Sequence, residues 1–217
     1  MPRLLSGRME LIRSLPDRLK IALDQQWRVE HRLTAPAGAY AELARRWHTQ
    51  DDPMNGRARS LAPYELAVLS QSGEDGVLCE MLRRIGPERH NESFVEFGTQ
   101  EGSETICGFL AYALGWPGLF MEGDPVAGKV LEQRWAGADV RTATSFITPQ
   151  SLNALLDAHD VPHEPAVFVI DVDGDDYHLW KALDRRPNVV VIEYNGSLPL
   201  ERDHVAVPAY RGDVEVG

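Results

Sequence analysis

The chain has 217 residues, of which 43% are hydrophobic and 8% aromatic, enough to bury the core of one ordinary domain with an appendage. Its formal net charge is −11, which argues against a protein that binds nucleic-acid phosphates or anionic lipid. The two cysteines, Cys79 and Cys107, lack the spacing of a metal site and make no disulfide framework. No stretch approaches the roughly 20 apolar residues that span a bilayer. We therefore expect a soluble cytoplasmic protein.

The first 50 residues or so have apolar side chains at helical spacing. Their basic, amphipathic start has no uninterrupted apolar segment, so we do not expect a signal peptide. A polar stretch with proline, asparagine and glycine follows over 51–60 and indicates a linker. The sequence thus divides into a helical N-terminal extension with its linker, 1–60, and a second domain, 61–217. The extension is expected to form a lid or a dimerisation arm, or else simply to pack on the core.

From residue 70 onward, helical and strand patterns alternate along the chain. A helix is predicted over 73–86, with Asp75 as its cap. The elements predicted after it are, in order, a strand over 93–98, a helix over 103–116 capped by Ser103, a strand over 118–124, a helix over 125–137, a strand over 139–147, a helix over 148–160, a strand over 166–173, a helix over 177–185 and a strand over 188–195. After the first helix, the five strands alternate with four helices. This alternation indicates an α/β fold, a Rossmann-like parallel sheet with helices on both faces.

Polar residues follow every predicted strand, and four of the five strand ends carry carboxylates. In an open parallel sheet, ligands bind beyond these carboxyl ends. Gly98 and Gly102 bracket the turn after the first strand, just past Glu96, where a ligand can approach the backbone and a helix N-terminus. Glu122 ends the second strand, where a carboxylate can accept both hydroxyls of a ribose. The order of these two signals favours a site for a ribose-containing ligand.

Five stretches of the chain, taken together, resemble class I S-adenosylmethionine-dependent methyltransferases, and most nearly the FkbM-like and other bacterial small-molecule or sugar O-methyltransferases. They are SQSGEDGVL, FVEFGTQEGSET, GWPGLFMEGDP, DVDGDDYHLWKAL and VVVIEYN, and they cover about residues 70 to 197. The resemblance implies S-adenosylmethionine as the cofactor. The cofactor-binding residues that it implies are Gln71 and Glu74 before the first core helix, Glu96, Gly98 and Gly102 at the methionine part, Glu122 at the ribose with Asp124 just beyond, Thr144 or Ser145 near the adenine, and Asp171 near the sulfonium.

The fourth strand leads into four aspartates within six positions, DVDGDD. Asp171 and Asp173 are two residues apart at the strand end, so we expect them to point the same way. With Glu193 and Asn195 at the end of the neighbouring strand, they form a set of hard oxygen ligands that suits Mg²⁺. Such an ion would lower the pKa of an acceptor hydroxyl and orient it. Without a metal, crowded carboxylates raise one another's pKa, so Asp171 or Asp173 can be a catalytic base. The nearby His178 is another candidate for this role.

Two other uses of the aspartate cluster remain open. Asp175 or Asp176 can simply cap the helix that follows. The pattern also resembles the first motif of haloacid-dehalogenase phosphatases, which need a lysine and an acidic pair well downstream, whereas Lys181 is the only later lysine. A glycosyltransferase DxD motif, which chelates a divalent ion on a sugar nucleotide, is the other possibility.

The C-terminal end departs from the methyltransferase pattern. That sheet usually has two further strands after the fifth, whereas only 22 residues follow Asn195. We therefore expect these strands to be missing, and an open strand edge favours a homo-oligomer such as a homodimer. The expected function is S-adenosylmethionine-dependent O-methyl transfer to a small molecule or saccharide, with no nucleic-acid or membrane partner. The alternatives are a non-catalytic methyltransferase-like partner protein and a DxD metal-dependent glycosyltransferase or phosphatase.

Overall fold

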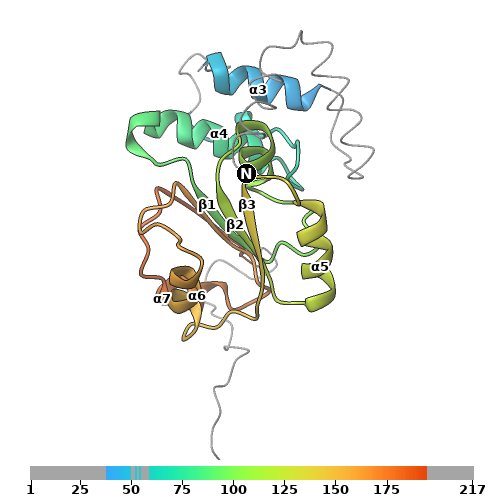
Figure 1. Cartoon of the computed structure of the whole chain (residues 1–217). Coiled ribbons are helices and arrows are strands. Elements are labelled where there is room, and N and C mark those ends of the chain that lie inside the picture. The colour runs from blue at the N-terminus through green and yellow to red at the C-terminus, as the bar shows by residue number, and fades with distance from the viewer. Residues whose placement is uncertain (1–37, 50–51, 53, 55–58, 195–217) are drawn as a thin grey trace, which may run out of the picture.

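Five parallel strands form one sheet in the order β3-β2-β1-β4-β5 (Figure 1). The computed structural model describes residues 38–49, 52, 54 and 59–194. The strands are β1 (Phe94–Phe97), β2 (Gly118–Glu122), β3 (Val140–Thr144), β4 (Val167–Ile170) and β5 (Val189–Ile192). The predicted parallel α/β sheet is confirmed, although each strand is shorter than predicted. The chain first winds outward from β1 to β3 and then returns past β1 to β4 and β5.

The helices alternate with the strands as predicted, with one exception. They are α3 (Ala39–Thr49), α4 (Glu74–Ile85), α5 (Pro125–Arg134), α6 (Leu152–Ala158) and α7 (Asp176–Ala182), with the 3₁₀ turns η1 (Ala62–Tyr64) and η2 (Pro87–Arg89) and the π-helix η3 (Leu110–Leu114). The helix predicted over 103–116 is wrong in its first turns, because helical backbone begins only at Gly108. The chain forms an irregular loop up to residue 105, and the amides of residues 105–107 donate to the Leu69 carbonyl and the Glu96 carboxylate instead of to helical carbonyls.

Alternate strand residues enter two separate hydrophobic cores on opposite faces of the sheet. One core contains Phe94, Phe120 and Val167 together with buried residues of α3, α4, η3 and α5. The other contains Phe168 and Ile170 together with buried residues of α6 and α7. All four residues of β1 and of β4 are buried, as expected of central strands covered on both sides. The burial of each large apolar side chain contributes about 1.5–3 kcal/mol.

Helix α3, in the predicted N-terminal extension, packs against the core. The Tyr40 ring contacts the rings of Phe109 and Tyr112, at centroid distances of 5.9 and 6.0 Å. Further along the helix, Trp47 contacts Trp116 at 5.7 Å. The described part of the extension therefore shares its core with the sheet. The helices predicted before residue 38 lie outside the described residues, and the division of the chain at residue 60 stays a prediction.

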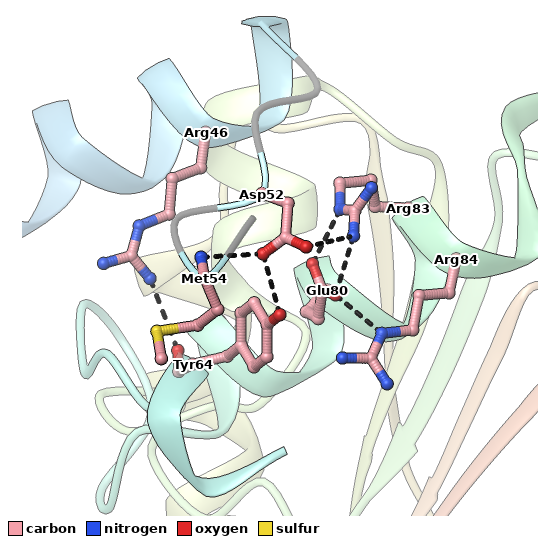
Figure 2. A network of polar contacts seen from close by, with 7 residues as sticks. All are labelled: Arg46, Asp52, Met54, Tyr64, Glu80, Arg83 and Arg84. Atoms are coloured by element: carbon pink, nitrogen blue, oxygen red, sulfur yellow. Dashed lines mark hydrogen bonds and ion pairs between the residues drawn. The ribbon is translucent and has the colours of Figure 1, made fainter. Parts of the chain in front are cut away.

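A polar network joins the segment after α3 to α4 (Figure 2). The Asp52 carboxylate accepts a hydrogen bond from the Tyr64 hydroxyl at 2.8 Å and lies 3.8 Å from the Arg83 guanidinium. Glu80, only 4% exposed, accepts hydrogen bonds from the guanidinium groups of Arg83 and Arg84 at 2.6–2.8 Å. Burial opposes ionisation of Glu80, but the two arginines hold its pKa below the usual value. The network thus fixes α4 against the linker.

Replacing Glu80 with alanine should lower the free energy of unfolding by about 1–2 kcal/mol, because the half-buried Arg83 and the exposed Arg84 lose their shared partner. Glu88→Ala is the control, since that carboxylate is 72% exposed and its replacement should change stability by less than about 0.5 kcal/mol. Urea unfolding of both variants measures the difference. Equal effects of the two substitutions would show that the network does not stabilise the fold.

Candidate functional site

The carboxyl ends of four strands bring polar residues to one level of the sheet. The register aligns Glu96 of β1 with Phe120 of β2 and Val169 of β4, and β4 with β5 in the same way. Two residues further along each strand, this register aligns Glu122, Gly98, Asp171 and Glu193 in that order across the sheet. The row therefore has carboxylates on either side of a residue that has no side chain. We call these four residues the carboxyl-edge row.

Gly98 is required by the close approach of β1 to β4. Its φ angle is +75°, and a Cβ atom there would lie 1.5 Å from the carbonyl oxygen of Asp171. Gly102, at φ +71°, is required by packing on α5, since a Cβ atom would lie 2.5 Å from Leu131 and 2.7 Å from the Trp135 indole nitrogen. Packing within the fold therefore explains why both of these predicted cofactor-binding residues are glycines. Their contact with a ligand stays a prediction.

Glu96 lies one pleat deeper than the row and is buried. Its two carboxylate oxygens accept hydrogen bonds from the backbone amides of Ile106 and Cys107 at 2.8 and 2.7 Å. Burial raises the pKa of Glu96 to about 7, and the nearby charge of Asp75 also raises it, while the two amides oppose the shift. Glu96 therefore holds the segment leading into η3. Its predicted contact with the methionine part of a cofactor is untested.

Asp75 has a structural role different from the predicted helix cap. The helix is preceded by Gly73, and its first turn has no side-chain cap. Instead, one oxygen of the buried Asp75 carboxylate accepts hydrogen bonds from the amides of residues 68–70 and from the Ser70 hydroxyl, at 2.7–2.9 Å. Burial raises the pKa of Asp75. Gln71 and Glu74, the two predicted cofactor contacts in this region, come after the anchored segment in the chain. Gln71 is exposed, and Glu74 accepts a hydrogen bond from the amide of Ser72.

Glu122 joins three loops at the ends of β1, β2 and β3. Its carboxylate oxygens accept hydrogen bonds from the amides of Gln100, at 2.6 Å, and Asp124, at 2.8 Å. Its carbonyl oxygen accepts one from the Ser145 amide at 2.9 Å. Asp124 in turn caps α5, since its carboxylate accepts hydrogen bonds from two amides of the first turn. The predicted residues Glu122, Asp124 and Ser145 therefore lie together.

Large apolar side chains are exposed in several segments that follow the strands, and sequence reasoning singled out none of them. The large hydrophobic residues concerned are Val126, Phe146, Tyr177, Trp180 and Tyr194, each in the segment that follows the carboxyl end of a strand. Phe146, which is 64% exposed, lies against Gly123, directly beside Glu122. An exposed aromatic side chain beside a carboxylate offers a ligand both apolar and polar contacts. The sequence signal that could have identified Phe146 is a large aromatic residue immediately after the polar end of a strand, as in TATSF.

The carboxylates of Asp171, Asp176 and Glu193 form a cluster in which one oxygen of each lies within 4.8 Å of the others. Asp171 and Glu193 are exposed, and Asp176 is buried. Partial burial raises the pKa of Asp171, and the charge of Asp176 raises it further. Partial burial also raises the pKa of Glu193, together with the charges of Asp171 and Asp176. The cluster is therefore a place where a proton or a cation is electrostatically favoured.

The structure brings Asp176, not Asp173, into this cluster. Asp171 and Asp173 were predicted to point the same way as alternate residues of one strand. Strand β4 ends at Ile170, however, and Asp173 has a left-handed φ of +55°, so strand geometry does not apply to it. Asp176, predicted as a possible cap, accepts hydrogen bonds at 2.9 Å from the amides of Val172 and Gly174 and so shapes the turn.

The other predicted residues of this region are placed as follows. Asp175 is buried and makes no side-chain cap hydrogen bond. His178 is half-buried in the first turn of α7, with its ring 5.6 Å from that of Tyr177. Its role as a base is untested. Asn195, the fourth predicted metal ligand, lies outside the described residues.

Comparison with protein-family models gives no match to this chain, and comparison with curated proteins gives no significant match. Among the described residues, none of the helices has the length and apolar character needed to cross a membrane. Support for a function therefore comes from the geometry and chemistry of the carboxyl edge.

Replacing Glu96 with glutamine should remove a pH dependence of stability between about pH 4.5 and 7. In this window the folded chain keeps a proton on Glu96, whose pKa is about 7, whereas the unfolded chain releases it near the usual value of 4.5. Wild-type stability should therefore fall as the pH rises through the window, by about 3 kcal/mol relative to the variant, and should level off above it.

Urea unfolding at several pH values measures this difference, and Glu132→Gln on the exposed side of α5 is the control. A difference between wild type and Glu96→Gln that stays constant with pH would show that Glu96 does not titrate in this range.

Proposed function

We propose that this protein is a methyltransferase with a Rossmann-like domain, which transfers a methyl group from S-adenosylmethionine to a hydroxyl of a small molecule or saccharide. The carboxyl-edge row is the observation that carries the proposal. The strand order supports it, because in such doubly wound sheets the ligand lies where the strand order reverses. Here the reversal falls between β1 and β4, at Gly98 and Asp171.

The nucleoside part of the cofactor fits the Glu122 side of the row. Carboxylate oxygens are acceptors with two lone pairs each. Glu122 can therefore accept hydrogen bonds from two ribose hydroxyls and keep those from the amides of Gln100 and Asp124. Phe146, which is exposed and lies against the neighbouring Gly123, offers apolar surface for a flat base. This end of the row therefore suits a ribose and its base.

The acceptor hydroxyl fits the other end of the row, at Asp171 and Glu193. S-adenosylmethionine, when bound, supplies an electrophilic methyl group on a positively charged sulfonium. Asp171, whose backbone carbonyl lies directly against Gly98, would bring its carboxylate close to this point, where it would stabilise positive charge. As the acceptor oxygen forms its new bond to the methyl carbon, the carbon–sulfur bond breaks and, when no metal is bound, the hydroxyl proton would pass to the Asp171–Glu193 pair. The raised pKa of both groups suits them to accept it.

Magnesium fits the cluster of Asp171, Asp176 and Glu193. Their oxygens lie within 4.8 Å of one another, and carboxylate oxygens are the ligands that Mg²⁺ prefers. A bound Mg²⁺ would lower the pKa of the acceptor hydroxyl. A DxD transferase or phosphatase would instead need Asp171 and Asp173 to act together, and Asp173 is not a member of the cluster. This geometry favours the methyltransferase proposal over the DxD alternatives.

A homodimer remains part of the proposal. β5 is the outer strand of the described sheet on its side, and an outer strand can pair with a second copy of the chain.

Wild-type protein should be stabilised by S-adenosylhomocysteine, by about 2.7 kcal/mol at 100 times the dissociation constant. Glu122→Gln should weaken this binding by about 1.5–3 kcal/mol, because a hydrogen bond to a charged acceptor is lost. Calorimetric titration measures the affinity, with Glu132→Gln as the control. Absence of wild-type binding at millimolar ligand contradicts the cofactor assignment. Unchanged binding by Glu122→Gln contradicts the position of the ribose.

Mn²⁺, used as a spectroscopic probe of the magnesium site, should bind the wild-type protein through the Asp171 cluster. Asp171→Asn and Glu193→Gln should each weaken binding by about tenfold or more, equivalent to about 1.4 kcal/mol, because each removes a negatively charged ligand. Asp173→Asn, from the same turn, is the matched control and should have a smaller effect. Electron paramagnetic resonance titration of free Mn²⁺ measures all four proteins. An effect of Asp173→Asn as large as that of Asp171→Asn would contradict the cluster geometry.

A further inference from the structure

The turn that follows β1 has a strained backbone. Three of its five residues have positive φ angles: Gly98 at 75°, Gln100 at 49° and Gly102 at 71°. Gln100 has a Cβ atom, so this conformation costs on the order of 1 kcal/mol or more and persists only where the surroundings enforce it. Strain of this kind gathers at ligand sites. The residues that enforce it are therefore of functional interest.

Three consecutive residues of the turn are held by side chains from β2 and the end of α5. The Gln100 amide donates to the Glu122 carboxylate at 2.6 Å. The Arg134 guanidinium donates to the carbonyl oxygen of residue 101 at 2.8 Å. The indole N–H of Trp135 donates to the Gly102 carbonyl oxygen at 3.2 Å. The first contact belongs to the proposed ribose site, and the other two come from behind the turn.

Trp135 connects the turn to the strand that carries Glu122. Its buried ring packs on Phe120 at a centroid distance of 4.9 Å, and Phe120 precedes Glu122 by two residues on β2. The other side of the indole lies against Gly102, where an added Cβ atom would come within 2.7 Å of the indole nitrogen. The indole thus sets the separation between the turn and β2, and its N–H fixes the orientation of the Gly102 carbonyl.

We infer that Trp135 is a positioning residue, which holds the turn 98–102 in its ligand-binding conformation before any ligand arrives. The inference rests on the proposed function and deepens it. A turn that is already ordered removes the entropy cost of ordering it on binding, so affinity depends on Trp135 although the side chain lies behind the turn. The sequence contains no motif that identifies this role.

Trp135→Phe tests the inference, because it keeps an aromatic ring against Phe120 and removes the N–H donor. Trp116→Phe is the matched control: Trp116 is buried in the same hydrophobic core, but its ring contacts those of Trp47, edge-on, and His90. In the ligand-free proteins, amide hydrogen exchange in a peptide covering residues 98–104 should accelerate in Trp135→Phe and not in Trp116→Phe. The S-adenosylhomocysteine dissociation constant should rise about threefold to tenfold in Trp135→Phe alone.

The two measurements separate the possible failures. Unchanged exchange of the 98–104 peptide in Trp135→Phe overturns the positioning role, whether or not the ligand binds. Faster exchange with an unchanged dissociation constant overturns the link between the ordered turn and binding. If the wild-type protein does not bind S-adenosylhomocysteine, the proposed function fails, and faster exchange confined to Trp135→Phe still supports the structural part of the inference.

Discussion

The contact between the ends of β1 and β4 is the constraint on which the rest of the site depends. Gly98 lies so close to the Asp171 carbonyl oxygen that any side chain would collide with it. The glycine therefore brings two strand ends together at the point where the strand order reverses. The row places Glu122 on one side of this glycine and Asp171 with Glu193 on the other. Two separate groups of carboxylates thus flank Gly98 at the edge where the proposed ligand would bind.

The acidic residues of this region divide into two groups according to burial. Asp75 and Glu96 are buried and hold backbone amides, so they fix the segments on either side of the site. Glu122, Asp171 and Glu193 lie at the edge, where they can contact a ligand. Of the three carboxylates that the resemblance assigns to the cofactor, Glu122 and Asp171 share the row, whereas Glu96 lies below it. The buried pair holds the framework, and the edge group is the part that the proposed chemistry uses.

The sequence predicted the strands and their polar ends well, because burial on both sides and short turns leave a direct pattern in the residues. It failed where the backbone leaves regular geometry. The amides of Ile106 and Cys107 are held by Glu96, ten residues earlier, so the missing first turns of the 103–116 helix were not visible. The left-handed φ angle of Asp173 belongs to an irregular turn shaped by Asp176, which the strand pattern does not indicate. The same holds for Phe146 and Trp135, whose importance depends on neighbours distant in sequence.

A crystal structure of the protein with S-adenosylhomocysteine tests the central claim most directly. The account predicts that the ribose hydroxyls lie within hydrogen-bond distance of the Glu122 carboxylate and that the sulfur lies over Gly98 and faces Asp171. A ligand bound anywhere else on the molecule, or one that leaves Glu122 and Asp171 without contact, would contradict it.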